Sequence, residues 1–336
     1  MEYRSLGRTG VQVSVLCLGC MNFGGKTSPE DSYRIIEHAL DAGINFLDTA
    51  NVYSRGRSEE VTGAALKRAG KRSKVILATK VHGRMDDEDP NAWGNARRHI
   101  IEQCEASLKR LQTDYIDLYQ IHRPQSGIPI DETLRALDDL IRAGKVRYIG
   151  TSTFAAWQLV ESLWVAKEFG LNRFVCEQPP YNLLDRRIES ELIPMAQTYG
   201  FGIIPWSPIA GGLLSGKYRR GQEFPPDARY ADAKGRPWME SRLTDGVFDV
   251  VEMLVPMAEE KGCSMAQLAL AWVIQRPGVT SPIIGPRTME HLVDNLGAVD
   301  VSFTDDELTQ IDAMIPPGSM VSPFYEADFG PHTFRW

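Results

Sequence analysis

The chain has 336 residues, enough for two ordinary domains or for one large barrel. Hydrophobic residues make up 43% and charged residues 24%, which is typical of a globular protein and excludes a disordered chain. Lys and Arg total 37 against 44 for Asp and Glu, a net charge of −7, so the sequence predicts no basic surface and no nucleic-acid partner.

The five cysteines are scattered and odd in number, which argues against a disulfide framework and favours a reducing compartment. Cys17 and Cys20 form a C-x-x-C motif, but the sequence holds no second Cys or His pair nearby to complete a zinc site. We therefore predict no metal. The first residues are polar, and no apolar run approaches the roughly 20 residues that span a bilayer. We expect a cytoplasmic protein with no membrane segment.

Short apolar runs rich in β-branched residues alternate with helical patterns along the chain. The predicted strands cover 13–19, 44–48, 74–80, 115–121, 146–151, 174–178, 202–205 and 281–284. The helices between and after them are predicted near 28–43, 58–69, 100–111, 134–141, 155–169, 189–199, 265–272 and from Thr288. In the first helix, Ser28 is a suitable N-cap, Pro29 suits the first helical position and Gly43 marks the end.

Strand–helix alternation of this kind predicts a parallel sheet covered by helices. Both an open doubly wound sheet and a closed (β/α)8 barrel fit, and eight units without a linker favour the closed barrel. We therefore expect a single domain over 1–336. The stretch 216–244 lacks periodicity and is predicted to be a long loop over the active-site face. Residues 316–336 are predicted to form a C-terminal tail packed on the domain.

Ionisable residues mark several predicted strand ends, where the chemistry of such a barrel lies. Asp48 ends the second strand, Lys80 the third and His122 the fourth, and Tyr53 lies in the loop after Asp48. Taken singly, each has an ordinary structural explanation, such as a turn-capping Asp or a snorkelling Lys. Together, the four residues are predicted to converge on one site.

That convergence has a specific chemistry. Free tyrosine, with a pKa of about 10, is a poor proton donor at neutral pH. A cation such as Lys80 beside the phenol oxygen stabilises the phenolate, and Asp48 would hold that cation in place. His122 could donate a hydrogen bond to a substrate oxygen. Such a donor suits a carbonyl oxygen that gains negative charge as a hydride arrives, and the hydride requires a nicotinamide cofactor.

Five motifs carry a family resemblance, and they occur in the family order over nearly the whole chain. They are Leu6-Gly-Arg-Thr-Gly10, the run Asp41-Ala-Gly-Ile-Asn-Phe-Leu-Asp-Thr-Ala-Asn-Val-Tyr53, Thr79-Lys80, Gln120-Ile-His122 and Gly211-Gly-Leu-Leu-Ser-Gly-Lys-Tyr218. With these motifs the sequence resembles the aldo-keto reductases. Its loops are similar to the microbial branch near the potassium-channel β-subunits and the aryl-alcohol and sugar-nucleotide reductases.

The resemblance implies a (β/α)8 barrel that binds NADP(H), with a catalytic tetrad of Asp48, Tyr53, Lys80 and His122 in which Tyr53 is the general acid. It also implies a cofactor site at the nicotinamide and pyrophosphate. The residues expected there are Gly19, Cys20, Met21, Asp48, Ser152, Thr153, Gln178, Trp206, Ser207, Pro208, Ile209, Gly211 and Lys217. Thr153 stands where many members have Asn.

The segment 284–295 resembles the part of the family that holds the adenosine 2′-phosphate. Gly285, Arg287 and His291 would face the phosphate, and Asp294 with Asn295 the adenine. Independently of the family, an Arg and a Thr at a helix N-terminus form an anion site, although a capped surface helix is the simpler alternative. An Arg here favours NADP(H) over NAD(H).

Two other nucleotide sites are less consistent with the sequence. Gly211 to Lys217 is almost a Walker A loop, but Tyr218 replaces the Ser or Thr that would bind magnesium. No G-x-G-x-x-G motif follows a strand, which disfavours a Rossmann site.

The sequence thus predicts an NADPH-dependent oxidoreductase that reduces an aldehyde or ketone, with a small-molecule carbonyl as its partner. Two alternatives remain: a low-turnover NADP(H)-binding regulatory subunit, and an enoyl reductase acting on a nucleotide-linked sugar. The family's channel-subunit branch lacks the His, and its double-bond reductases have Glu there, so His122 favours carbonyl chemistry. Phe23, Trp93 and Arg123 are predicted to line the substrate pocket with Tyr53 and His122. The substrate and the choice between monomer and homo-oligomer stay open.

Overall fold

Eight parallel strands form the centre of the computed structural model, in which residues 1–322 are described except for 227, 232 and 235. In chain order they are β3 (Cys17–Gly19), β4 (Phe46–Asp48), β5 (Ile76–Val81), β6 (Ile116–Ile121), β7 (Val146–Ser152), β8 (Cys176–Gln178), β9 (Gly202–Ile203) and β10 (Ile283–Ile284). Each strand pairs in parallel with the next from β3 to β9, and β10 returns to pair with β3. The strand order is therefore the chain order.

The sheet closes between β9 and the segment before β10. Ile203 forms a parallel bridge with Val279, its carbonyl accepts from the Thr280 N–H at 2.7 Å, and the Ile283 N–H donates to the Pro205 carbonyl at 2.8 Å. These bonds join β9 to the segment that leads into β10, and β10 in turn pairs with β3. The closed (β/α)8 barrel expected from the sequence is confirmed, and the open doubly wound sheet is excluded.

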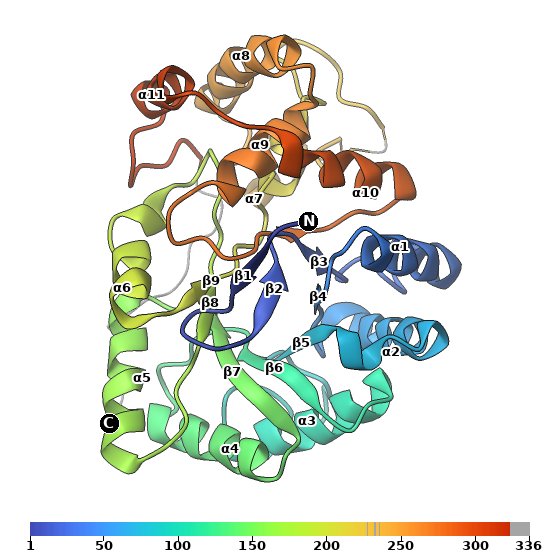
Figure 1. The fold of residues 1–336 in the computed structure, drawn as a ribbon, viewed down its shortest axis with the longest axis vertical. Coiled ribbons are helices and arrows are strands. Elements are labelled where there is room, and N and C mark those ends of the chain that lie inside the picture. The colour runs from blue at the N-terminus through green and yellow to red at the C-terminus, as the bar shows by residue number, and fades with distance from the viewer. Residues whose placement is uncertain (227, 232, 235, 323–336) are drawn as a thin grey trace.

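Helices surround the strands on the outside, as Figure 1 shows. They are α1 (Pro29–Asp41), α2 (Arg57–Ala69), α3 (Arg97–Leu111), α4 (Ile130–Arg142), α5 (Ala156–Phe169), α6 (Leu192–Tyr199), α7 (Pro237–Glu240), α8 (Asp245–Glu260), α9 (Met265–Ile274), α10 (Met289–Leu296) and α11 (Asp305–Met314). The Ser28 hydroxyl accepts from the Asp31 N–H at the start of α1, as the sequence predicts. Helices α7, α8 and α11 were not expected from the sequence.

The predicted strand over 13–19 is wrong as a single element. Its first part is β2 (Gln12–Ser14), which pairs antiparallel with β1 (Tyr3–Ser5), and only its last part is the barrel strand β3. The hairpin lies across the centre of the helix ring in Figure 1. Leu6 and Val13 are fully buried against the apolar interior of the barrel. The apolar run is continuous because both parts are buried, although they belong to different sheets.

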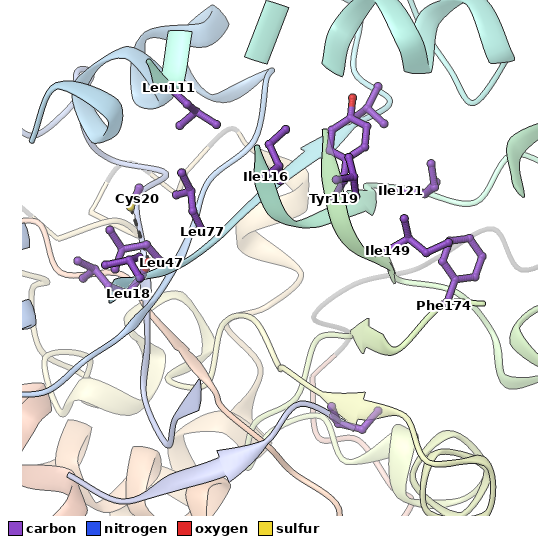
Figure 2. Close-up of a cluster of buried hydrophobic side chains, with 14 of the residues drawn as sticks. Leu18, Cys20, Leu47, Leu77, Leu111, Ile116, Tyr119, Ile121, Ile149 and Phe174 are labelled. Carbon is purple, nitrogen blue, oxygen red and sulfur yellow. Dashed lines mark hydrogen bonds between the residues drawn. The ribbon is translucent and has the colours of Figure 1, made fainter. Parts of the chain in front are cut away.

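Alternate residues of each strand face opposite sides. Leu18, Leu47 and Leu77 on adjacent strands face outward, where they belong to the cluster between strands and helices drawn in Figure 2. The inward positions before the strand ends are apolar: Cys17, Phe46, Ala78, Leu118 and Cys176 form one cluster with the hairpin. Two residues further along four of these strands, the inward positions are Asp48, Lys80, Gln120 and Gln178. The barrel therefore has an apolar layer beneath a polar one.

The segment 216–244, predicted to be a long loop over the active-site face, carries buried aromatic rings and contains the short helix α7. Tyr218 and Tyr230 are almost fully buried and meet edge to face at 5.4 Å, and the Tyr230 N–H donates to the Tyr218 hydroxyl at 3.2 Å. In the predicted tail, the Val321 N–H donates to the Leu184 carbonyl at 2.8 Å. Residues 323–336 of that tail lie outside the described residues. In the described part of the chain, no helix is both long and apolar enough for a membrane span.

Helix α2 packs closely on the end of α3 at Gly63. A Cβ on Gly63 would lie 2.4 Å from the Leu111 carbonyl oxygen, a backbone atom that cannot rotate away. Elsewhere in a helix, Gly→Ala stabilises by about 1 kcal/mol. We expect Gly63→Ala to reverse that sign and to cost about 1–3 kcal/mol by overpacking, as measured by urea unfolding.

Gly10→Ala is the control, because a Cβ at Gly10 would meet nothing within 4 Å. A Gly63→Ala protein as stable as the parent would contradict the described contact between α2 and α3.

Candidate functional site

The ammonium of Lys80 is the centre of the polar layer. It forms an ion pair with Asp48, donates to the Thr49 carbonyl at 2.9 Å, and donates to the Tyr53 hydroxyl oxygen at 3.3 Å. The Lys80 side chain is fully buried. Burial alone would lower the pKa of Lys80, but the Asp48 carboxylate and the Tyr53 oxygen outweigh it and hold that pKa above its usual value. Lys80 is therefore a fixed cation whose three N–H bonds all have partners.

Adjacent strands and a tight turn bring these three residues together. Asp48 and Lys80 are inward positions near the ends of β4 and β5. Asp48 pairs across the two strands with Ala78, which is two residues before Lys80. Tyr53 begins the short 3-10 turn Tyr53–Gly56, in which Ser54 and Arg55 adopt positive φ values of 47° and 51°. The turn brings the phenol back over the strand end, where the sequence predicted it.

His122 completes the predicted tetrad. It directly follows β6, and its ring meets the Tyr53 ring edge to face, with centroids 5.6 Å apart and an interplanar angle of 83°. Burial and the nearby charges of Lys80 and Arg123 hold the pKa of His122 well below its usual value. The imidazole is therefore neutral at physiological pH and can donate one hydrogen bond. The structure brings all four residues of the tetrad to one place.

Gln120 belongs to the same network, and the sequence analysis gave it no role. Its Nε2 donates to Asp48 Oδ2 at 2.9 Å. Gln178 Nε2 donates to that same oxygen at 3.0 Å and to Gln120 Oε1 at 3.1 Å. A carboxylate only accepts, so both amide nitrogens must face Asp48, which leaves Gln178 Oε1 to accept from a ligand. The signal was available: Gln120 stands two residues before His122, on the inward face of the same strand.

A cavity of about 450 Å³ opens from the tetrad along the carboxyl ends of the strands. Most of the predicted site residues line it: Gly19, Met21, Asp48, Tyr53, His122, Arg123, Ser152, Gln178, Trp206, Ser207, Pro208, Ile209, Gly211, Lys217, Gly285, Arg287, His291, Asp294 and Asn295. These residues come from segments that are far apart in the sequence. The cavity is the place where they meet.

Five predicted site residues lie outside that lining, and one of them is Lys80, whose ammonium lies behind the Asp48 and Tyr53 side chains that do line the cavity. Phe23 is fully buried in the core between the strands and helices, because its ring turns into the barrel wall. Cys20 is likewise buried, and burial raises the pKa of its thiol to about 12. Trp93 is 41% exposed and packs edge to face on His82. Thr153 is turned away from the cavity, and its hydroxyl donates to the Ser152 carbonyl at 2.6 Å.

The sequence analysis missed several residues that line the cavity. They are Asn22, Gly212, Ser215, Tyr218, Ala228, Arg229, Ser264, Ala266, Leu270, Ile283, Ile284 and Pro286. Ser264 had a local signal, because it is the N-cap of α9 and forms a capping box with Gln267. Ala228 and Arg229 belong to the 216–244 segment, which the sequence placed at this face without naming residues.

The end of the cavity away from the tetrad is cationic. Lys217, Arg287 and His291 line it, and burial together with the Lys217 and Arg287 charges lowers the pKa of His291. The N-termini of α9 and α10 also point here, capped by Ser264 and Thr288. Helix N-termini and guanidinium groups both attract anions. This end therefore suits a phosphate.

Between the two ends, the chain after β9 turns back on itself. Ser207, Ala210, Gly211 and Gly212 all have positive φ values, from 50° to 107°. Such turns expose successive backbone N–H groups to a ligand and can cradle an anion. The cavity thus has a neutral, hydrogen-bonding end at the tetrad and a cationic end at α9 and α10.

A (β/α)8 barrel with Asp, Tyr, Lys and His gathered at its strand ends has the architecture of an aldo/keto reductase. The sequence model of the Aldo/keto reductase family matches residues 15–316, and the chain belongs to that family.

Three relatives span almost the full length of the chain. "Uncharacterized oxidoreductase YrpG" of Bacillus subtilis (strain 168) is 41% identical over 97% of this chain and 99% of its own. A "Probable voltage-gated potassium channel subunit beta" of Oryza sativa subsp. japonica is 39% identical, over 94% and 97% respectively. The protein of the same name from Arabidopsis thaliana is 38% identical, over 90% and 92%.

The two thiols of the C-x-x-C motif form no disulfide in the described part of the chain. Cys17 and Cys20 are free and fully buried, in different apolar clusters. Burial raises the pKa of both thiols. Within the residues that the structure describes, no group of three or more His, Cys, Asp or Glu could hold a metal ion.

The depressed pKa of His122 predicts a loss of stability in acid. Below pH about 6.5 the unfolded chain binds a proton at this residue and the folded chain does not. The free energy of unfolding therefore decreases as the pH is lowered. We expect His122→Asn to lose less stability than the parent between pH about 7.5 and about 5.5 in urea unfolding. Equal losses in the two proteins would show that His122 is protonated in the fold.

Proposed function

We propose that this protein is an NADPH-dependent oxidoreductase that reduces an aldehyde or ketone to the alcohol. The observation that carries the proposal is the Tyr53 hydroxyl held 3.3 Å from the buried Lys80 ammonium at the wall of the cavity. Aldo/keto reductases generally bind NADP(H), and the oxidoreductase relative from Bacillus subtilis supports the reaction class.

The lining of the cavity is compatible with a nicotinamide dinucleotide phosphate. Gln178 can offer its Oε1 to the carboxamide, and the Ser152 hydroxyl, which donates to the Gln178 carbonyl at 2.9 Å, lies beside it. The Trp206 side chain also lines this part of the cavity and can flank the ring. When bound, the reduced nicotinamide supplies a hydride to the carbonyl carbon.

Tyr53 supplies the proton to the carbonyl oxygen. Lys80 donates to the Tyr53 oxygen, so the phenol's own hydrogen is directed elsewhere and is available to a substrate. The fixed ammonium stabilises the phenolate that remains after transfer. His122, neutral and beside Tyr53, donates a second hydrogen bond that orients the substrate oxygen.

The cationic end holds the adenosine phosphates. Arg287 and Lys217 provide the positive charge, and the α10 N-terminus provides free N–H groups. A 2′-phosphate here makes charge-assisted hydrogen bonds that a 2′-hydroxyl cannot make. This favours NADPH over NADH.

Replacement of Tyr53 tests the role of the acid. We expect Tyr53→Phe to lower the rate of NADPH oxidation with 4-nitrobenzaldehyde by at least about 10²-fold, because the proton donor is lost. NADPH binding, followed by fluorescence, should stay within about threefold of the parent.

Tyr199→Phe, on the exposed end of α6, is the matched control and should keep full activity. Full turnover by Tyr53→Phe would remove the proposed acid.

Replacement of Arg287 tests the choice of cofactor. We expect Arg287→Met to raise the KM for NADPH about 10- to 100-fold, the value of a charged hydrogen bond, and to change the KM for NADH little. Arg34→Met, on the outer surface of α1, is the matched control. An equal effect on both cofactors would place the 2′-phosphate elsewhere.

A second function is favoured by the plant relatives, which are named as probable potassium channel β-subunits. The chain would then bind NADP(H) and act mainly as a regulatory subunit. The parent protein distinguishes the two: tight NADPH binding without turnover over a broad panel of aldehydes and ketones would support the regulatory function and contradict the enzyme.

A further inference from the structure

Glu177 is a buried carboxylate beside the site that the proposed chemistry does not use. It lies on β8 between Cys176 and Gln178, and it is fully buried. The Thr151 hydroxyl donates to its Oε2, and the Phe154 N–H donates to its Oε1 at 3.1 Å. The Thr153 backbone N–H, which donates to the Gln178 carbonyl at 3.2 Å, also lies near this carboxylate and favours its ionised form. Glu177 therefore links β8 to the turn between β7 and α5.

That turn is strained and has few other supports. Thr153 has a φ of 60°, a left-handed conformation that is costly for a β-branched residue. The helix that follows, α5, has Ala155 at its N-cap, and alanine has no side-chain oxygen to accept from the turn. Thr153 is held by its own hydroxyl bond to the Ser152 carbonyl and by its N–H bond to the Gln178 carbonyl at 3.2 Å. After it, the Ala155 N–H donates to Gln158 Oε1 at 2.9 Å, and the Phe154 N–H donates to Glu177.

The turn and β8 each contribute a group to the neutral end of the cavity. Ser152 is the last residue of β7 and Gln178 the last of β8, and the two pair in register. Both line the cavity, while Glu177 lies behind them on the opposite face of the strand. A shift of the turn would therefore move the Ser152 hydroxyl relative to the Gln178 amide.

We propose that Glu177 is a positioning residue for the nicotinamide end of the cavity: it fixes the strained Thr153 turn and so sets the spacing between Ser152 and Gln178. This inference rests on the proposed binding of NADPH. Glu177 does not touch the ligand, and it acts through the turn from behind the cavity wall.

The cost of burying this acid supports a positioning role over a purely stabilising one. Burial raises the pKa of Glu177 to about 8, even though the hydrogen bonds from the turn and the nearby Arg123 charge act in the opposite direction. Ionising the side chain is thus opposed by its surroundings. A glutamine could accept from the Phe154 N–H through its Oε1 and donate to Thr151, whose hydroxyl can then donate to the Cys176 carbonyl at 3.3 Å.

The test compares two ligands that share the cationic end. NADPH has the nicotinamide, and adenosine 2′,5′-bisphosphate lacks it. We expect Glu177→Ala to weaken NADPH binding at least about tenfold and to leave binding of adenosine 2′,5′-bisphosphate within about threefold, because only the neutral end is displaced. Glu177→Gln should restore NADPH binding to within about threefold of the parent.

Glu59→Ala is the matched control. Glu59 is also fully buried and accepts from the Thr79 hydroxyl and Arg110, both at 2.6 Å, but it makes no described hydrogen bond to the turn that carries Ser152. Its loss should reduce stability without changing the ratio of the two affinities. If Glu177→Ala does not fold, Thr151→Val removes one donor to the carboxylate and should weaken NADPH selectively, by a smaller factor.

The outcomes separate the two proposals. Failure of the parent to bind NADPH would overturn the proposed function itself. A parent that binds NADPH, with variants at Glu177 and Thr151 that affect both ligands equally or neither, would overturn the positioning role alone.

Discussion

The ion pair of Lys80 and Asp48 inside the barrel is the constraint on which the rest of the site depends. Two charges without water are costly, by several kcal/mol each, unless every polar atom has a partner. Here Asp48 accepts from Lys80, Gln120 and Gln178, and Lys80 donates to Asp48, Thr49 and Tyr53. Removal of Asp48 or Lys80 leaves the other charge uncompensated, and removal of Gln120 or Gln178 leaves a buried carboxylate oxygen with one donor fewer. The tetrad and the amide layer therefore form one hydrogen-bonded unit.

The apolar layer below makes that unit effective. The hairpin β1–β2 covers the amino end of the barrel with Leu6 and Val13, so apolar side chains lie between that end and the polar layer. A low dielectric strengthens the effect of the ammonium on the phenol and keeps His122 neutral. The apolar layer that stabilises the barrel and the polar layer that holds the tetrad thus lie one above the other in the barrel interior.

The two ends of the cavity are formed from successive parts of the chain. The neutral end is built on strands β4 to β8, whereas the cationic end is built on α9, α10 and the turn after β9. A ligand with a neutral ring at one end and phosphates at the other would join these parts across the carboxyl face. The two proposed functions would share this binding mode and would differ in whether the tetrad is used.

From its sequence alone, this protein could be read as eight strand–helix units, with Asp48, Lys80 and His122 at strand ends and Tyr53 just beyond, because local periodicity and chain order suffice to find strand ends. Sequence could not show that the run 13–19 divides between two sheets, that Phe23 turns into the core, or that the buried Glu177 side chain bonds the turn after β7. Those features depend on strand register and on the closure of the sheet. Register and closure are set by contacts between segments remote in the chain, and no local pattern records them.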